Sequence, residues 1–421
     1  MVSFAETLAG RPAGRVLVVH NAYQYKGGED SVVEAELELL QTRGHRVEVY
    51  SRDNDELAGA GPFTTARDTL WSPRTMREMA ARISAFQPDV IHVHNTFPLI
   101  SPSVCWAAAR AHIPVVQTLH NFRLLCASGM FLRDGEVCED CLGKLPWRGV
   151  VHRCYRGSAG HSAMLVAMLG LHRALRTYQN KVTRYIALSE FSRAKLIQGG
   201  LPAHKISVKP NFVTASAGGG SERKGGLFVG RLAREKGIAL LLAALNRLPG
   251  AIVDVMGSGP EAGAVARHAR VRHHGRQEQS AVLAAMRCAA YLVLPSITYE
   301  NFPRTIVEAF ACGLPVIASR LGALAEIVED TRTGLLFEPG SPEDLAQKIA
   351  WAEADPAAMR RMGENARGEY ELKYTAEINY QQLMRIYQEA VACMPGSPVR
   401  IGDDTLATQR DQTRTRLRVD S

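Results

Sequence analysis

The first half of the chain alternates between short apolar runs and segments whose apolar residues recur with helical spacing. Arg15–His20 is an apolar run that suits a buried parallel strand, and Ser31–Gln41 has the spacing of an amphipathic helix. Further strands are expected at 46–51, 89–95, 114–120, 184–189 and 205–211. Strands that alternate with helices predict βαβ units around a parallel sheet.

The same alternation restarts after a glycine-rich segment. Residues 215–226 hold five glycines and no large apolar side chain, which is typical of a flexible linker. Beyond it, the pattern predicts strands and helices at 227–231, 237–248, 251–257, 291–296, 303–312, 315–319, 334–337 and 342–352. We therefore expect an α/β chain of two Rossmann-like, doubly wound domains that face each other across a cleft, where a ligand would bind.

The domain boundaries follow from these patterns. We expect an N-terminal domain over 1–212, a linker over 213–226 and a second domain over 227–375. The helical segment 376–393 is expected to pack back on the N-terminal domain, and the polar residues 396–421 to be disordered. A length of 421 residues suits two or three domains.

Composition and hydropathy narrow the class of protein. Hydrophobic residues make up 46% and charged residues 22% of the chain, which excludes disorder and collagen-like repeats. No apolar run approaches the roughly 18 residues of a membrane-spanning helix, and residues 1–15 lack the apolar core of a signal peptide. We expect a cytoplasmic protein and leave contact with the inner face of the plasma membrane open.

The formal charge of +8 is unevenly spread. Between Leu142 and Arg184 there are eight basic residues and no Asp or Glu. Such a stretch suits anionic lipid headgroups, phosphorylated acceptors or nucleic acid, and a solvated basic face explains it equally well. Within it, the apolar segment Ala163–Leu171 precedes His172, Arg173 and Arg176. This segment predicts an interfacial helix or, with a slight preference, a core helix with a basic exposed end.

Two basic residues follow the first strand of the second domain. The strand leads directly into Arg231, and Lys236 stands before Gly237, where the next helix opens. A cation pair at the carboxyl end of a strand and beside a helix N-terminus is well placed to hold a diphosphate. Surface Arg and Lys are common, so the pair by itself is a weak signal.

Two carboxylates follow a later strand. Glu300 lies in the loop after that strand, and Glu308 lies inside the helix that Pro303 begins. Free amides near Arg304 and Thr305 would face an anionic ligand, and the helix dipole would add attraction. The carboxylates could accept hydrogen bonds from the hydroxyls of a sugar and a ribose, although each one taken singly is more often a solvated group.

Together these motifs resemble those of a known enzyme family. The ordered set Gly230-Arg231-x4-Lys236-Gly237, Gly257-Ser-Gly-Pro260 and Glu300-x7-Glu308 is similar to that of the retaining GT-B glycosyltransferases of family 4. The resemblance implies the GT-B fold and transfer of a sugar from a UDP- or GDP-sugar to a glycan, lipid-linked or small-molecule acceptor, in the synthesis of surface polysaccharides or glycoconjugates. It also implies retention of the anomeric configuration without a catalytic metal, because Arg and Lys neutralise the leaving diphosphate.

The resemblance further implies roles for single residues. Arg231 and Lys236 would neutralise the donor diphosphate, and Glu308 would bind the ribose. Glu300 and His120 would hydrogen-bond the donor sugar. The implied catalytic residues are Glu300, His120, Arg231 and Lys236. The implied donor-binding set is Gly27, Gly28, Arg231, Lys236, Gly257, Glu300, Asn301, Phe302, Thr305 and Glu308. Asn301 stands where the family usually has Gly, which changes the expected sugar pocket.

Four of the eight cysteines lie close together in sequence. Their spacing is C-x11-C-x2-C-x12-C, and they form a Cys-rich loop over 126–154: Cys126, Cys138, Cys141 and Cys154. The tight central pair has the spacing that zinc sites favour, whereas disulfides are disfavoured in a reducing cytoplasm. We expect a structural zinc site where the acceptor enters, with unliganded thiols as the alternative and His152 as a substitute ligand.

The alternatives to glycosyl transfer are nucleic-acid binding and epimerisation of a nucleotide sugar. A nucleic-acid-binding zinc-loop protein would use the basic stretch, but the aromatic residues there, Trp147, Tyr155 and Tyr178, are too sparse for a stacking platform. A nucleotide-sugar epimerase on the same fold would need further acid–base groups around the sugar, and none is evident. The expected partners are therefore a nucleotide sugar, a glycan or lipid-linked acceptor and an anionic membrane surface, and no nucleic acid is expected.

Overall fold

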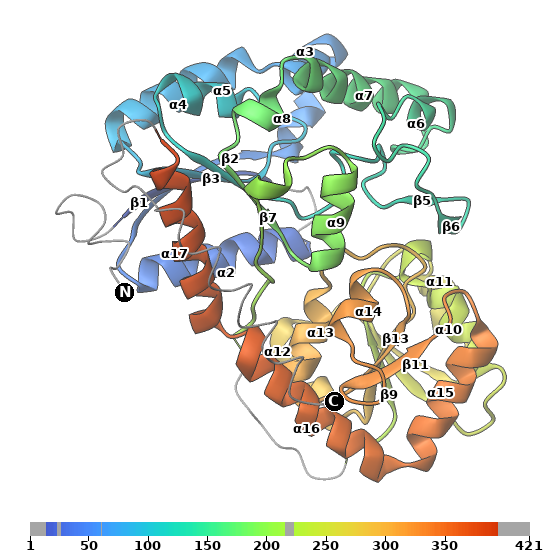
Figure 1. Ribbon diagram of the computed structural model, residues 1–421. Helices are drawn as coiled ribbons and strands as arrows, with labels where there is room; N and C mark the ends of the chain where they lie inside the picture. The colour runs from blue at the N-terminus through green and yellow to red at the C-terminus, as the bar shows by residue number, and fades with distance from the viewer. Residues whose placement is uncertain (1–13, 23–26, 60, 215–222, 395–421) are drawn as a thin grey trace, which may run out of the picture.

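The computed structural model describes residues 14–22, 27–59, 61–214 and 223–394. They form two α/β domains, each built on one six-stranded sheet, which lie one above the other in Figure 1. This architecture confirms the expected fold class. Most of the glycine-rich segment and the whole of the tail expected to be disordered lie outside the described residues.

The first sheet is parallel, with the order β2-β1-β3-β4-β7-β8. Its strands are β1 (Arg15–Ala22), β2 (Arg46–Asp53), β3 (Val90–Asn95), β4 (Val115–Thr118), β7 (Arg184–Ala187) and β8 (Ile206–Val208). Its main helices are α2 (Gly28–Thr42), α3 (Pro62–Leu70), α4 (Pro73–Phe86), α5 (Val104–Arg110), α7 (Ala159–Ala174) and α9 (Glu190–Gln198). The chain turns to opposite sides of β1 when it forms β2 and β3, which creates a switch point between β1 and β3.

The second sheet is also parallel, with the order β11-β10-β9-β12-β13-β14. Its strands are β9 (Gly226–Val229), β10 (Val253–Met256), β11 (Val271–Gly275), β12 (Tyr291–Leu294), β13 (Val316–Ser319) and β14 (Gly334–Phe337). Its main helices are α10 (Ile238–Leu245), α12 (Gln279–Cys288), α13 (Arg304–Ala311), α14 (Ala323–Ile327), α15 (Pro342–Ala354) and α16 (Pro356–Lys373). The direction in which successive strands are added to the sheet reverses between β9 and β12, so the switch point of the second sheet lies there. The sequence pattern did not predict β11, because this edge strand carries Arg and His instead of an apolar run.

Burial on both faces explains why the strands are apolar throughout. Residues 16–19 of β1 are at most 1% exposed. Val16 and Val18 pack into one hydrophobic cluster, whereas Leu17 and Val19 pack into another, because successive side chains point to opposite faces of a sheet. The first of these clusters continues into the second domain and includes Ile306 of α13.

The last helix crosses from the second domain to the first. α16 lies on the second domain, and α17 (Ala376–Ala392) then runs beside α2, as Figure 1 shows. Tyr387 of α17 shares a 2.7 Å hydrogen bond with His92 Nδ1 of β3. Asn379 receives a hydrogen bond from the buried Lys209 at 3.1 Å. α17 therefore completes the core of the first domain although it follows the second domain in sequence.

α7 contains the apolar segment that suited either a core helix or an interfacial one. Leu165 and Leu169 are fully buried, which agrees with the core interpretation. The interpretation of His172 as a flanking cation is wrong, because this side chain is buried, stacks on Trp71 and hydrogen-bonds Thr177 and the Leu70 carbonyl. Burial lowers the pKa of His172, so the imidazole is neutral.

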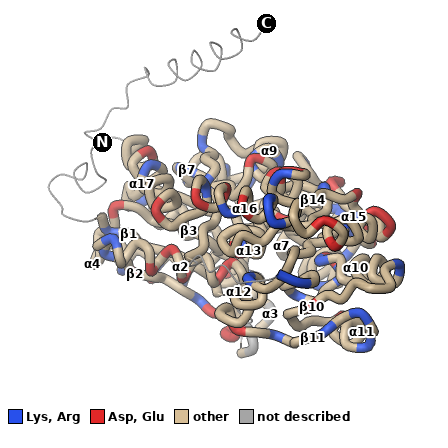
Figure 2. Tube along the Cα trace, turned by 90° about the horizontal axis from the view of Figure 1, so that it is seen from below, with Lys and Arg blue, Asp and Glu red and all other residues tan. Residues whose placement is uncertain are grey.

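Part of the basic stretch is engaged within the protein. Arg173 donates to the carbonyls of Lys144 and Leu124, and Arg184 contacts Glu389 of α17 at 3.4 Å. These cations support the fold instead of facing a partner. In Figure 2, Lys and Arg alternate with Asp and Glu over α15, α16 and α17, so that side of the molecule carries charges of both signs.

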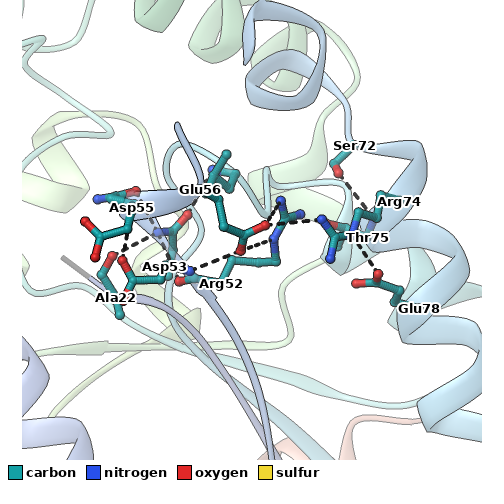
Figure 3. A network of polar contacts seen from close by, with 12 residues as sticks. Ala22, Arg52, Asp53, Asp55, Glu56, Ser72, Arg74, Thr75 and Glu78 are labelled. Carbon is teal, nitrogen blue, oxygen red and sulfur yellow. Dashed lines mark hydrogen bonds and ion pairs between the residues drawn. The ribbon is translucent and has the colours of Figure 1, made fainter. Parts of the chain in front are cut away.

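A charged network braces the carboxyl end of β2 (Figure 3). Arg52 binds Glu56 through two hydrogen bonds of 2.8 Å. Arg74 of α4 reaches the same carboxylate at 3.2 Å and Glu78 at 2.7 Å. The Ser72 hydroxyl accepts from the Thr75 amide at the start of α4. The network ties the end of β2 to α4.

Candidate active site

The carboxyl ends of the two sheets meet between the domains. Arg231 follows β9 and Glu300 follows β12, so both lie at the switch point of the second sheet, where such folds bind ligands. Asn301 joins this edge to the first domain, since its Nδ2 donates to the Leu119 carbonyl at 2.6 Å and its Oδ1 accepts from the Ser192 hydroxyl. The structure therefore brings the predicted residues of the second domain next to the loop that carries His120.

Two glycines allow the loops at this switch point to pack at backbone distance. Gly237 has a φ of +69°, and a Cβ there would lie 1.7 Å from the Pro295 carbonyl oxygen. Gly257 has a φ of +155°, and a Cβ there would lie 1.9 Å from the Gly230 carbonyl oxygen. Any side chain at either position would separate the loops after β9, β10 and β12. Gly257 thus shapes the site through packing.

Lys236 and Glu300 form an ion pair. Lys236 Nζ donates to Glu300 Oε1 at 2.6 Å, and Ser296 Oγ donates to the same oxygen at 2.7 Å. Burial raises the pKa of Glu300, but Lys236, Ser296 and Arg231 outweigh it and hold the pKa below its ordinary value. The carboxylate is therefore ionised at neutral pH, and it can accept hydrogen bonds from hydroxyl groups.

Arg231 lies beside this pair and is more open. Its side chain is 63% exposed and pairs with Glu235, four residues later. Both predicted cations therefore stand on one turn of chain, Lys236 held by a carboxylate and Arg231 able to reach an incoming anion. An arginine and a lysine in these positions suit a diphosphate.

Glu308 lies inside α13 with a side chain that is 13% exposed. Arg304 Nη2 and Gln279 Nε2 each lie 3.5 Å from its Oε1. Burial raises the pKa of Glu308, and Arg304 offsets only part of that effect. Thr305 is half-buried in the first turn of the same helix. Phe302 is buried against Tyr374, so its side chain belongs to the core and only its backbone could contact a donor.

Gly27 and Gly28 stand where α2 begins, after the first strand. The Gly27 amide receives support from Asp30, whose Oδ2 accepts its hydrogen at 2.8 Å. Asp30 Oδ1 in turn lies 2.8 Å from His20 Nε2. A Cβ at Gly28 would meet no atom within 4 Å. Gly28 therefore leaves open space beside the backbone at the start of α2, and the contact of both glycines with a donor stays a prediction.

His120 is held by a second histidine. Its Nε2 lies 2.9 Å from Nδ1 of His94, and the two rings stack with centroids 5.2 Å apart. The bond leaves Nδ1 of His120 as the ring nitrogen for a ligand. Burial and the neighbouring His94 hold the pKa of His120 well below its ordinary value, so the ring is neutral at physiological pH.

A buried polar cluster stands behind His120, and the sequence analysis missed it. Glu36 of α2 binds Lys209 at 2.9 Å and lies 2.9 Å from His92 and 3.5 Å from His94. Burial raises the pKa of Glu36, but Lys209 and the histidines lower it well below the ordinary value. The alternation His92-Val-His94 in an otherwise apolar strand was the available signal, because it places both histidines on one face of β3.

This cluster has donor atoms at metal-like spacing. In the part of the chain that the structure describes, Glu36, His92 and His94 have ligand atoms within 4.8 Å of one another. Lys209 nevertheless contacts the same carboxylate, and a cation there would be repelled. His92 is also engaged by Thr118 at 2.8 Å. The cluster fits a positioning role for His94 better than metal binding.

The cysteines of the Cys-rich loop come together in space. All four line one small cavity beside the first domain, with His152 among the other lining residues. They are free thiols, and burial together with the neighbouring sulfurs raises the pKa of Cys141 to about 11. The two-stranded hairpin β5 (Leu132–Arg133) and β6 (Glu136–Val137) lies within this loop. The residues predicted to bind the nucleotide sugar and the four cysteines therefore form separate groups in the structure.

Two family models match the chain on either side of the linker. Residues 26–216 match Glycosyltransferase Family 4, and residues 218–369 match Glycosyl transferases group 1. The matches meet where the glycine-rich segment lies, so each describes one of the two domains. The chain belongs to the group 1 glycosyltransferases of family 4. Enzymes of this class transfer a sugar from a nucleotide-sugar donor to a glycan or lipid acceptor.

Relatives that are named as glycosyltransferases agree with this enzyme class. Phosphatidyl-myo-inositol mannosyltransferase of Mycolicibacterium smegmatis is 26% identical over 94% of this chain and 98% of its own length. An uncharacterized glycosyltransferase of Methanocaldococcus jannaschii is 33% identical over 39% of this chain, and that match spans about half (48%) of the relative.

Solved structures show the same fold. Sucrose-phosphate synthase of Thermosynechococcus elongatus aligns with a TM-score of 0.67 and 21% identity, over 90% of this chain and 99% of that one. HepE of Anabaena, solved with UDP and glucose, aligns with a TM-score of 0.62 and 18% identity, over 89% and 99%. Among the described residues, no helix is long and apolar enough to cross a membrane.

Proposed function

We propose that this chain is a retaining glycosyltransferase that moves a sugar from a UDP- or GDP-sugar to a hydroxyl of a glycan, lipid-linked or small-molecule acceptor. The observation that carries the proposal is the Lys236–Glu300 pair beside Arg231, at the switch point of the second sheet. A donor diphosphate would bind the two cations. Glu300 and His120 would then hold the donor sugar between the domains, and Glu308 would hold the ribose.

The charges of this site suit catalysis without a metal. When the bond between the sugar and the phosphate breaks, negative charge develops on the diphosphate, and Arg231 and Lys236 are placed to stabilise it. In the proposed reaction an oxygen of the leaving phosphate takes the proton of the acceptor hydroxyl. The acceptor oxygen then bonds to the anomeric carbon on the face that the phosphate leaves, so the configuration is retained.

The acceptor would approach from the side of the first domain. The surface of this domain that faces the membrane would be the one around α6 (Arg148–Val151). Trp147 is 56% and Val151 is 65% exposed, next to basic residues of the 142–184 stretch such as Arg153. Exposed apolar side chains among cations suit an anionic lipid surface at the cytoplasmic face of a membrane. Sedimentation with phosphatidylglycerol vesicles tests this placement. Equal binding to phosphatidylcholine vesicles, or none to either, would contradict it.

Calorimetric titration with UDP, GDP and ADP tests the donor site. We expect one nucleotide to bind, and Arg231→Ala to weaken that binding. Arg247→Ala serves as a matched control, because Arg247 pairs with Glu343 at the far end of α10. Unchanged affinity in Arg231→Ala, or no binding of any nucleotide by the parent, would refute the proposed site.

The stereochemical and metal predictions need product analysis. The anomeric proton coupling in the product, measured by NMR, should match that of the donor sugar. Turnover should persist after chelation by EDTA followed by desalting. An inverted product or loss of turnover that Mg²⁺ restores would contradict the metal-independent retaining mechanism, while leaving the glycosyltransferase class intact.

A further inference from the structure

The four cysteines of the Cys-rich loop converge from separate parts of the chain. Cys126 precedes the β5–β6 hairpin, Cys138 directly follows it, and Cys154 comes after α6. With Cys141 they line a cavity of about 10 Å³. A space of that size holds roughly one water molecule, so it can hold one metal ion.

Packing around the cavity is tight. A Cβ at Gly149 would lie 2.7 Å from Ala127 Cβ and 3.8 Å from Cys154 Cβ, so only glycine fits there. The Gly149 amide donates to the Pro146 carbonyl at 3.0 Å, and the Gly149 carbonyl accepts from the Cys154 amide at 2.9 Å, which ties this segment to one of the cysteines.

The charges that line the cavity complement a thiolate-bound zinc ion. Zn²⁺ with four thiolates carries two net negative charges. Arg133 and Arg148 line the cavity, and they contact Asp140 at 2.6 Å and 3.5 Å. Two cations bridged by one carboxylate leave positive charge beside the sulfurs. Such an arrangement would offset the negative charge of a zinc ion bound by four thiolates.

The backbone of this loop contains strained residues. Three non-glycine residues of the loop adopt positive φ values of 51–56°: Phe131, Asp134 and Arg153. Each such residue is strained by about 1 kcal/mol or more, and the strain persists only where the surroundings fix the conformation. The hairpin offers two residue pairs, and Phe131 is fully buried in the core of the first domain, whereas Asp134 and Arg153 are exposed.

The loop reaches across to the second domain next to the donor site. Glu139, between Cys138 and Cys141, binds Lys195 at 2.6 Å and hydrogen-bonds the Tyr299 hydroxyl. Tyr299 directly precedes Glu300. The Thr298 hydroxyl donates to the Met130 carbonyl, so a second contact joins the same two segments. A change in the loop would therefore be felt at Glu300.

We propose that Cys126, Cys138, Cys141 and Cys154 bind one Zn²⁺ ion, and that this ion fixes Glu139 against Tyr299 beside the donor site. The second half of the statement rests on the proposed glycosyltransferase function. No three of the sulfurs lie within 4.8 Å of one another, so binding would draw them to the spacing of about 3.8 Å that Zn–S bonds of about 2.3 Å impose. Binding would release the thiol protons to solvent.

Metal analysis of the purified full chain tests the ion. We expect one zinc per chain, near zero in Cys141→Ser, and one in Cys393→Ser, a matched control at an exposed thiol after α17. Because Cys141→Ser could misfold, the unaltered chain is also exchanged with Co²⁺, whose thiolate charge-transfer absorption reports sulfur ligation. Parent protein with no zinc, or with Co²⁺ that shows no such absorption, overturns the proposal.

Glu139→Gln and Tyr299→Phe test the positioning of the donor loop. Both should keep one zinc per chain, and each should lower kcat for sugar transfer about three- to tenfold. The double variant should be no worse than the more affected single variant, because both remove one hydrogen bond. Additive losses or unchanged kinetics with zinc retained would overturn the positioning role. If the chain binds no nucleotide, the proposed function fails, whereas metal content still decides the zinc site.

Discussion

Lys236 Nζ lies 2.6 Å from Glu300 Oε1, so the cation expected to hold the donor phosphate and the carboxylate expected to hold the donor sugar bind each other. The pair keeps both side chains oriented toward the interdomain face. It also keeps the carboxylate ionised, because Lys236 lowers the pKa of Glu300 against the effect of burial. The two groups therefore act as one preorganised unit, which is the arrangement that electrostatic catalysis requires.

Lys236→Ala should weaken nucleotide binding and turnover together. It removes the charge-assisted hydrogen bond that we propose Lys236 donates to the diphosphate, and it leaves Glu300 without its cation. We expect kcat/KM to fall by about 10- to 150-fold, which corresponds to about 1.5–3 kcal/mol. Steady-state kinetics and calorimetry measure the two effects. An unchanged Kd for the nucleotide would show that Lys236 does not touch the diphosphate.

Glu300→Gln should separate catalysis from nucleotide affinity. The amide keeps the size of the side chain but loses the charge that pairs with Lys236 and that we propose accepts from sugar hydroxyls. We expect kcat to fall by at least about tenfold while the Kd for the free nucleoside diphosphate changes by less than about threefold. Equal losses in both quantities would place Glu300 at the nucleotide instead of the sugar.

Glu308→Gln should stabilise the fold and weaken nucleotide binding. Burial raises the pKa of Glu308 above its unfolded value, so the ionised form is unfavourable in the fold at neutral pH. The stability that depends on this group is present at low pH and is lost as pH rises through the folded pKa. Thermal unfolding at pH 7 should show a Tm higher by about 1–2 °C. A lower Tm, or a gain equally large at pH 4, would contradict the pKa shift.

His94→Asn should reduce turnover through His120. His94 Nδ1 lies 2.9 Å from His120 Nε2, and no donor contact is assigned to His94. We expect kcat to fall by about tenfold with nucleotide Kd unchanged, and His94→Asn combined with His120→Ala to be no slower than His120→Ala.

The same pair makes a pH prediction. The pKa of His120 lies well below the ordinary value, and that of His94 is lowered to about 3 by burial and neighbouring histidines. Both rings are therefore neutral throughout the range in which an exposed histidine titrates, near pH 6.5. kcat/KM should show no inflection from them between about pH 8 and pH 6. An inflection that His120→Ala abolishes would refute the assignment.

Tyr387→Phe should loosen the attachment of α17 to the first domain. It removes the 2.7 Å hydrogen bond to His92 Nδ1 in a fully buried site. We expect a loss of about 0.5–1.5 kcal/mol, the net contribution of one hydrogen bond, because Glu36 still lies 2.9 Å from the same ring nitrogen. Tyr380→Phe is the control, since its bond to His45 lies nearer the surface. Denaturant unfolding should rank the two variants in that order.

The fold could be predicted from local patterns, and the candidate residues of the second domain from those patterns together with the family resemblance. Apolar runs marked β1, β9 and β12 because parallel strands buried on both faces have few polar residues. Arg231, Lys236, Glu300 and Glu308 could be found because they lie within a few residues of strand ends or helix starts. The edge strand β11 could not, since its exposed faces carry Arg and His in place of the apolar signal.

What the sequence by itself determined is the order of strands and helices, the division at the glycine-rich segment and the residue types at the carboxyl ends of the second sheet. Tertiary structure alone decided that Lys236 binds Glu300, that Asn301 bridges to Leu119 and that His94 stands behind His120. It also buried His172, which local charge patterning had made a surface cation. The physical reason is that these contacts join residues 26 to 182 positions apart, and only the packing of one element against another brings them within hydrogen-bond distance.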